Sequence, residues 1–193
     1  TAAGDGDTAG GSVSVKADEV LTLDGSVDVA GKTPGTLLLG AQTIAVGPGA
    51  GQIKAGKLSG SNGSVTLQAK GDLTVDEAVT LATAGTKLTA SAGGTMTLNE
   101  GITAHDIDVQ AQSGEITVKK TLDASYTTVG VSGGTINVAG KTVTVENSAT
   151  LTAAGDGDTA GGSVSVKADE VLTLDGSVDV AGKTPGTLLL GAQ

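Results

Sequence analysis

The chain has 193 residues, of which 32 are glycine, and it contains no Cys, Phe or Trp. Its 21 acidic residues outweigh 11 cations, all of them lysine, and the net charge of −10 disfavours nucleic acid and acidic membrane surfaces as partners. Zero Cys excludes disulfide and thiolate-metal scaffolds, and no apolar run reaches the ~18 residues that a membrane-spanning helix needs. The core of this protein must be narrow and aliphatic.

The beginning of the chain occurs twice. Residues 1–42 return letter for letter as residues 152–193, so one repeat of 151 residues (1–151) is followed by the start of an identical one (152–193). Tandem repetition is typical of solenoids, in which each unit buries its apolar face only against its neighbours. We therefore expect residues 1–193 to form a single continuous solenoid segment of a longer rod.

From Ser12 onward, short segments alternate apolar and polar residues and are separated by Gly, Asp, Asn or Lys turns. A spacing of two is the period of a β-strand, and no window shows the period of an amphipathic helix, so every predicted element is a strand. In chain order, the residues expected to point into the core are Val13/Val15, Leu21/Leu23, Val27/Val29, Leu37/Leu39, Ile44/Val46, Val65/Leu67, Leu73/Val75, Val79/Leu81, Leu88/Ala90, Met96/Leu98, Ile102/Ala104, Ile107/Val109, Ile116/Val118, Leu122/Ala124, Val129/Val131, Ile136/Val138, Val143/Val145 and Leu151/Ala153.

The recurrence of these strands predicts the coil of a three-sided β-solenoid, because three strands occupy about 20–27 residues. The predicted fold is all-β, a right-handed parallel β-helix whose hand follows the strong preference of parallel crossovers. A lone coil buries too few aliphatic side chains to offset the entropy lost on ordering it. Stacked coils must therefore stabilise one another through hydrogen-bonded strands.

The coil boundaries are clear in part of the chain. The clearest predicted coils are residues 12–35, 64–85, 86–105 and 106–126, and longer loops are expected around 47–51, 56–63 and 155–162. Residues 128–133 do not fit a strict count of three strands. This leaves two alternatives, six coils with an extra strand or seven coils per repeat.

Two segments, GGTINVAGKTVTVENSATLTAAGDGDTAGG and GGSVSVKADEVLTLDGSVDVAG, resemble the coils of filamentous-haemagglutinin-type adhesins. These are the large exoproteins of two-partner secretion in Gram-negative bacteria. Autotransporter passenger domains have similar coil sequences. The resemblance covers essentially the whole chain. It implies a right-handed parallel β-helix, an exported rod, and roles in adhesion, biofilm cohesion or display of a distal domain. It implies no catalytic residue.

The acidic loop GDGDTAGG is one candidate site. It places Asp5 and Asp7 two residues apart, and the second repeat places Asp156 and Asp158 in the same way. Carboxylates in a Gly-rich turn can ligate Ca²⁺. The spacing of an EF-hand loop is not met, however, and a glycine-rich calcium repeat needs tandem copies. A solvated turn is favoured, with a weak calcium site as the alternative.

A row of threonines is a second candidate. If the central strands stack in register, one outer face carries Thr22, Thr74, Thr97, Thr117 and Thr144, interrupted by Ala45. Flat Thr rows can order water, as in ice-binding solenoids. Thr is also a common solvent-facing strand residue, and the flanking Asp24, Asp76, Asn99 and Lys119 vary in chemistry. An ordinary sheet surface is the favoured interpretation.

Catalytic chemistry has little support in the sequence. His105, the only histidine, stands beside Asp106 and Asp108 without a second His or Cys, and we interpret it as a surface turn. The acidic pairs Asp76–Glu77 and Asp18–Glu19 suggest a polysaccharide lyase or hydrolase, since many are β-helices. The sequence has no Arg, Trp or Phe to stabilise charge or stack on sugars, and fold analogy alone does not establish activity. We predict no catalytic, cofactor-binding or metal-binding residue.

The sequence therefore predicts a structural rod segment of a large secreted bacterial adhesin, located at the outer-membrane-associated cell surface. The expected partners are neighbouring identical repeats of the same chain, with self-association or a surface polysaccharide bound through the full-length protein as further hypotheses. Neither membrane insertion nor nucleic acid binding is expected, since the basic pair Lys119–Lys120 is too short to follow a phosphate backbone. The alternative function is a Ca²⁺- or carbohydrate-binding module, ahead of a polysaccharide-active enzyme or an ice-binding solenoid.

Overall fold

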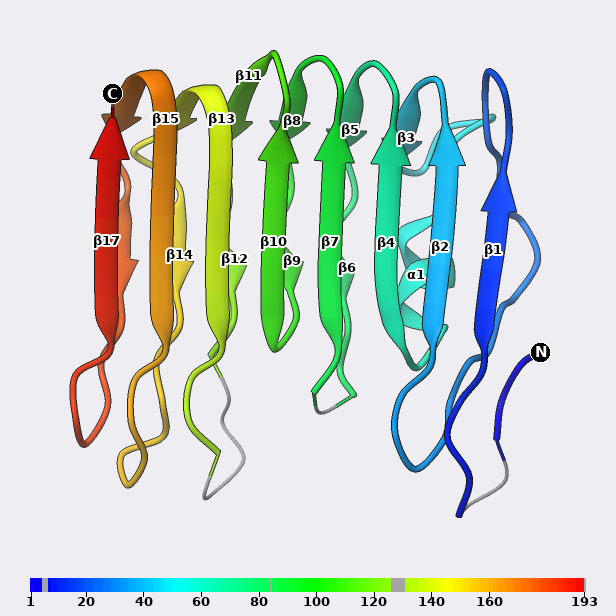
Figure 1. Ribbon diagram of the computed structural model, residues 1–193, viewed down its shortest axis with the longest axis horizontal. Coiled ribbons are helices and arrows are strands. Elements are labelled where there is room, and N and C mark those ends of the chain that lie inside the picture. The colour runs from blue at the N-terminus through cyan, green and yellow to red at the C-terminus, as the bar shows by residue number, and fades with distance from the viewer. Residues whose placement is uncertain (5–6, 84, 126–130, 193) are drawn as a thin grey trace.

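The computed structural model, which describes residues 1–4, 7–83, 85–125 and 131–192, is a solenoid of stacked parallel strands (Figure 1). In Figure 1 the strands in front run upward, those behind run downward, and successive coils move from right to left between the N- and C-termini. This combination is a right-handed winding. The predicted all-β, right-handed parallel β-helix is confirmed.

Three stacks of strands form the sides of the solenoid. Side one consists of β1 (Ser12–Lys16), β2 (Thr36–Ala41), β4 (Ser64–Ala69), β7 (Lys87–Ala92), β10 (Asp106–Ala111), the first halves of β13 (Thr135–Val145) and β15 (Ser163–Leu174), and β17 (Thr187–Ala192). Side two consists of β3 (Ile44–Val46), β5 (Leu73–Val75), β8 (Met96–Leu98), β11 (Glu115–Val118) and the second halves of β13 and β15. Side three consists of β6 (Val79–Thr80), β9 (Ile102–Thr103), β12 (Leu122–Asp123), β14 (Thr150–Thr152) and β16 (Ser177–Asp179).

The strand register on side one fixes the number of coils. The shortest coil separates the paired residues Lys87 and Asp106, 19 residues apart, and the longest separates Asp106 and Thr135, 29 residues apart. The coils therefore vary more than the predicted range of 20–27 residues. Between Ser12 and its repeat equivalent Ser163, the strand pairs make six steps, so the repeat contains six coils. Residues 131–133 form no extra strand, while residues 126–130 lie outside the described part of the chain.

The predicted core is largely confirmed. Every predicted inward pair from Leu37/Leu39 to Leu151/Ala153 is buried except Val129/Val131. Val129 lies outside the described residues, and Val131 is half-buried. The structure adds a column of buried alanines, in register at the ends of the side-one strands: Ala41, Ala69, Ala92 and Ala111. A methyl group is the side chain that fits where the chain turns the corner into side two, because solenoid interiors are close-packed.

The prediction of strands alone is wrong at one place. The helix α1 (Ala55–Ser59) occupies a segment expected to be a loop, and it lies against β6 on side three. Ala55 and Leu58 are three residues apart and both buried, which is the spacing of one helical face. The Glu77 carboxylate accepts a hydrogen bond from the Ala55 N–H at 3.1 Å. Among the described residues, no helix is long and apolar enough to cross a membrane.

The two copies of the repeated sequence adopt different local structures. In the second copy, residues 163–174 form the long strand β15 and residues 177–179 form β16, both paired with the preceding coil. In the first copy, the identical sequence forms β1 and then only an isolated bridge at Val20. The predicted strands around Leu21/Leu23 and Val27/Val29 are therefore present only in the second copy. A neighbouring coil stabilises strand structure that the sequence alone does not maintain.

Candidate functional site

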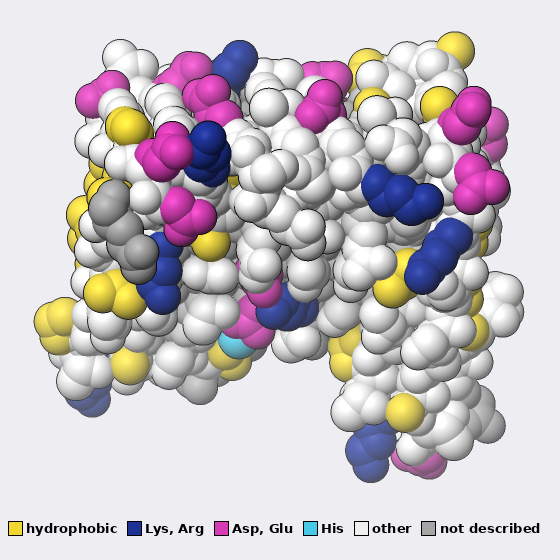
Figure 2. Space-filling model, turned by 45° about the horizontal axis from the view of Figure 1, so that its top comes forward, with side chains coloured by type: hydrophobic (Ala, Val, Ile, Leu, Met, Phe, Trp, Pro, Cys, Tyr) yellow, Lys and Arg dark blue, Asp and Glu magenta, His cyan; other side chains and the backbone are white. Residues whose placement is uncertain are grey.

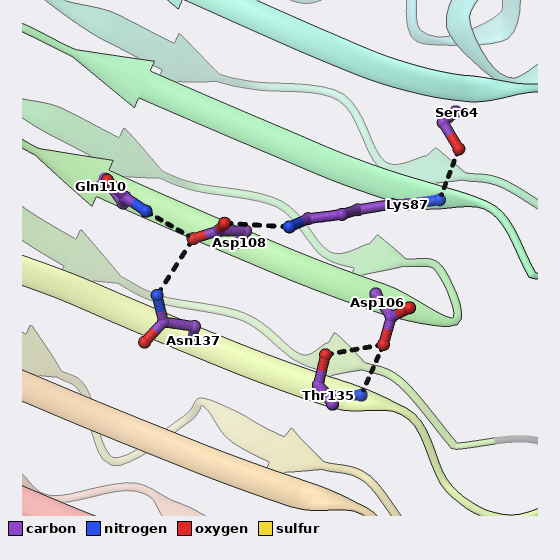
Figure 3. A network of polar contacts seen from close by, with 7 residues as sticks. All are labelled: Ser64, Lys87, Asp106, Asp108, Gln110, Thr135 and Asn137. Atoms are coloured by element: carbon purple, nitrogen blue, oxygen red, sulfur yellow. Dashed lines mark hydrogen bonds and ion pairs between the residues drawn. The ribbon is translucent and has the colours of Figure 1, made fainter. Parts of the chain in front are cut away.

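A cluster of charged and amide side chains lies on the outer face of side one, across β7, β10 and β13 (Figure 3). Successive side chains of a strand point to opposite faces, so Asp106, Asp108 and Gln110 of β10 all face outward. The side-one register places Lys87 beside Asp106 on one flank and Asn137 beside Asp108 on the other. We call this group the carboxylate cluster.

Asp108 is the centre of the carboxylate cluster. Its Oδ2 lies 3.0 Å from the Lys87 Nζ, which projects from the preceding coil. Its Oδ1 accepts hydrogen bonds from Gln110 Nε2 at 2.9 Å and from Asn137 Nδ2, on the following coil, at 3.0 Å. One carboxylate thus links three consecutive coils.

Asp106 makes a second set of contacts at the start of β10. Its Oδ1 accepts hydrogen bonds from the backbone N–H of Thr135 at 3.0 Å and from the Thr135 hydroxyl at 2.6 Å. Its Oδ2 lies 3.2 Å from His105 Nδ1. The His105 side chain is 25% exposed and lies in the bend between β9 and β10, next to this carboxylate.

The protonation chemistry of the carboxylate cluster follows from these partners. Burial raises the pKa of Asp108, but hydrogen bonds from Gln110, Asn137 and Lys87 outweigh it and hold the pKa below its ordinary value. Burial likewise raises the pKa of Asp106, and the contacts with Thr135 and His105 bring it below the ordinary value. A general acid at neutral pH needs a raised pKa. These carboxylates are suited to accept hydrogen bonds between coils.

The same coil-to-coil bond recurs along the solenoid. A carboxylate accepts a hydrogen bond from an Asn or Thr one coil further on in the pairs Asp28–Asn62 (3.3 Å), Asp72–Thr95 (2.9 Å) and Asp76–Asn99 (2.7 Å). The backbone N–H and hydroxyl of Thr95 hold the pKa of Asp72 below its ordinary value, and the Ala30 N–H and Asn62 amide do so for Asp28. Sequence reasoning missed these bonds, because the partners are identified only once the register between coils is known.

The two acidic pairs singled out in the sequence do not form a shared site. Asp76 contacts Asn99 on the next coil, whereas Glu77 accepts the N–H of Ala55 at the start of α1. Asp18 and Glu19 are both exposed at the corner after β1. Neither pair has the facing carboxylates that a glycosidase uses on the two sides of a sugar bond.

The acidic loops are only partly described. Asp5 lies outside the described residues, and Asp7 is exposed. In the second copy, the Asp156 Oδ1 accepts a hydrogen bond from the N–H of Asp158 at 3.2 Å, which turns this carboxylate toward its own loop. Within the described part of the chain, no group of three or more His, Cys, Asp or Glu is arranged to hold a metal ion.

The threonine row exists in the predicted register. On side two, Thr74, Thr97, Thr117 and Thr144 pair in succession, and Thr173 of the second copy continues the row. Ala45 precedes Thr74 as predicted, but Thr22 lies outside any strand. The row is a single file, flanked by the hydrogen-bonded Asp76 and Asn99. The basic pair Lys119–Lys120 lies at the next corner, between β11 and β12.

Comparisons of the chain with models of protein families, with curated proteins and with solved structures found no match. Its function must therefore be inferred from its own geometry. That geometry is a regular solenoid whose coil-to-coil carboxylates serve its cohesion.

Proposed function

We propose that the chain is a rod-forming repeat segment of a large secreted bacterial surface adhesin. The rod holds a tip domain away from the cell and so supports cell adhesion or biofilm cohesion. The observation that carries the proposal is the junction between repeats: β15, the first strand of the second copy, pairs with β13 before it and with β17 after it. The solenoid passes from one repeat to the next without interruption.

The junction has a mechanical consequence. Six coils at a strand spacing of about 4.8 Å advance the rod by about 29 Å for each repeat. From the third coil onward, strand hydrogen bonds on three sides resist bending, and the coil-to-coil carboxylates add to them. Because residues 152–193 are identical to residues 1–42, a repeat can be added or removed at this junction without creating a new interface.

The surface charge also suits a long secreted rod. A net charge of −10 on the chain makes parallel rods repel one another and disfavours lateral aggregation. The expected location is the outer-membrane-associated cell surface. Enzymatic activity is not part of the proposal: of the acidic pairs considered for catalysis, Asp76 and Glu77 accept hydrogen bonds from Asn99 and Ala55, and Asp18 and Glu19 are exposed.

Polypeptides containing one, two and four whole repeats test this proposal. Small-angle scattering should show a constant cross-section and a length that grows by about 29 Å per repeat. Deletion of residues 87–105, one whole coil, should keep the rod folded, whereas deletion of residues 87–95 breaks the coil register. A compact particle, or a length that does not scale with repeat number, would overturn the proposal.

On cells, adhesion through a displayed tip should weaken as repeats are removed one at a time. Adhesion that does not depend on repeat number would contradict the spacer role.

A further inference from the structure

A polar groove runs along the corner where side one turns into side two, over the first five coils. Its volume is about 500 Å³, and the charged and polar side chains that line it are Lys16, Asp18, Gln68, Lys70, Ser91 and Gln112. We call it the corner groove. None of these residues belongs to the carboxylate cluster.

The depth of the corner groove follows from the sequence of one outward column. Lys16, Gly40, Gln68 and Ser91 occupy successive coils at the same register position. The glycine stands between two long side chains, and a Cβ added to it would lie 3.3 Å from the Lys16 Cγ. The missing side chain opens the floor of the groove between Lys16 and Gln68.

The lysines of the corner groove form no ion pair with another described residue. Among the described residues, the ion pairs within 4.0 Å are Lys87–Asp108, His105–Asp106 and Lys141–Glu170. Neither Lys16 nor Lys70 has a carboxylate partner in this part of the chain, although acids outnumber lysines overall. Figure 2, which brings this corner forward, shows two lysine side chains next to each other toward the N-terminal end of the solenoid.

The side-chain amides of the corner groove, like its lysines, are not engaged by other described residues. In the described chain, the side-chain amides of Gln68 and Gln112 make no hydrogen bond to another protein group. This differs from Gln110, on the same face, whose amide is held by Asp108. The groove therefore presents unpaired ammonium and amide groups above a floor of small residues.

The N-terminal part of the corner groove recurs in the second copy of the repeated sequence. A second hollow of about 360 Å³ is lined by Lys167, Asp169 and Gly191, which are the repeat equivalents of Lys16, Asp18 and Gly40. Six coils separate the two, or about 29 Å along the rod. An array of such repeats presents one groove per repeat on the same corner.

We propose that the corner groove binds an acidic polysaccharide of the polyuronate class. The carboxylates of the polysaccharide pair with Lys16 and Lys70, which lie two coils apart, about 10 Å along the axis of the solenoid. Hydroxyls of the sugar next to Lys70 meet the amide of Gln68 on the same coil, and hydroxyls two coils further along meet the amide of Gln112. The recurrence of the groove favours a polymer over a small ligand, because a polymer that reaches several weak sites gains affinity from the effective concentration of the later ones.

The composition of the corner groove disfavours a nucleic acid in the same place. The sequence has no Arg, Phe or Trp, so the planar cation and the stacking platforms that bind phosphates and bases are missing. Asp18 reduces the formal charge of the groove to +1 and would repel densely spaced phosphates. A sugar hydroxyl, in contrast, can donate a hydrogen bond to that carboxylate.

The test measures binding of the 193-residue chain to an oligogalacturonate by calorimetry, with the fully methyl-esterified oligomer as the uncharged control. The groove variant combines Lys16→Gln, Lys70→Gln and Lys167→Gln. The matched control combines Lys119→Gln, Lys120→Gln and Lys183→Gln, which removes the same charge elsewhere. We expect the groove variant to lose about tenfold in affinity and the control variant less than about twofold. Added salt should weaken binding of the unmodified chain.

Several results would overturn the assignment. These are equal losses in both variants, equal binding of the methyl-esterified oligomer, an absence of measurable binding, or tighter groove binding of single-stranded DNA. Circular dichroism shows whether each variant keeps its β-structure, which is expected because the substituted lysines of the groove are exposed. The rod proposal is separate, since scattering measures repeat length whether or not a glycan binds.

Discussion

The duplicated sequence allows one core substitution to be made in two environments. Leu39 and its repeat equivalent Leu190 have identical neighbours in sequence, but Leu39 is 0% exposed beneath β4, whereas Leu190 on β17 is 44% exposed. We predict that Leu39→Ala destabilises the chain strongly and that Leu190→Ala does so weakly.

The magnitudes follow from burial. Replacing a fully buried leucine by alanine costs about 2–5 kcal/mol, because the lost transfer free energy adds to the cost of a cavity. Leu67 of β4 lies in register with Leu39 one coil further on, and both are buried. The cavity left by Leu39→Ala is therefore enclosed. At Leu190, roughly half of the side chain is already in solvent and no coil closes over it, so we expect about 1 kcal/mol or less.

Urea denaturation followed by circular dichroism measures both variants. Leu39→Ala should lower the midpoint with an unchanged m-value, and the loss of unfolding free energy should exceed that of Leu190→Ala by about 2 kcal/mol. Leu38→Ala, on the outward face of β2, serves as the control for the loss of side-chain volume alone. Equal destabilisation at positions 39 and 190 would refute the stacking described here.

Two further substitutions test the polar and glycine positions. Asp108→Asn removes the charge that Lys87 and its amide partners stabilise and should cost about 1–2 kcal/mol at neutral pH, measured by urea denaturation. The folded-state pKa of Asp108 lies below the unfolded value of about 3.9. The contribution of Asp108 to the free energy of unfolding is therefore complete above that value and is lost as the pH falls through the folded pKa. A variant whose stability has the same dependence on acid pH as that of the parent would contradict this role. Gly134→Ala would place a Cβ 1.6 Å from the His105 carbonyl oxygen and should cost at least about 2 kcal/mol, whereas Gly157→Ala, with open space around it, should change stability by less than about 0.5 kcal/mol in a thermal melt. Equal melting temperatures for the two glycine variants would show that the close backbone approach at position 134 is absent.

The alternation of apolar and polar residues predicted the fold because each inward-facing position is occupied by an apolar residue that can be recognised in the sequence. Pairs such as Leu73/Val75 and Ile116/Val118 are buried as expected, since a strand period of two leaves only one arrangement that hides them. The helix α1 gave no such signal. Its five residues contain only two buried positions, too few to establish a helical period.

The polar contacts could not be predicted in the same way. Asp108 and Asn137 are 29 residues apart, and Asp72 and Thr95 are 23 apart, so their partnership depends on coil lengths that vary from 19 to 29 residues. The corner groove was missed for a related reason. Lys16 comes from the first coil and Gln68 and Lys70 from the third, and Gly40, which separates Lys16 from Gln68, has no distinguishing pattern in the sequence.

A repeat of six whole coils also determines orientation. Had the repeat contained a fractional coil, each copy would begin on a different side of the rod, and any surface feature would spiral around it. With a whole number, Lys16 and Lys167 lie on the same corner. Equivalent surface groups of successive repeats therefore lie on one edge of the rod, about 29 Å apart, and a partner that contacts them binds along that edge.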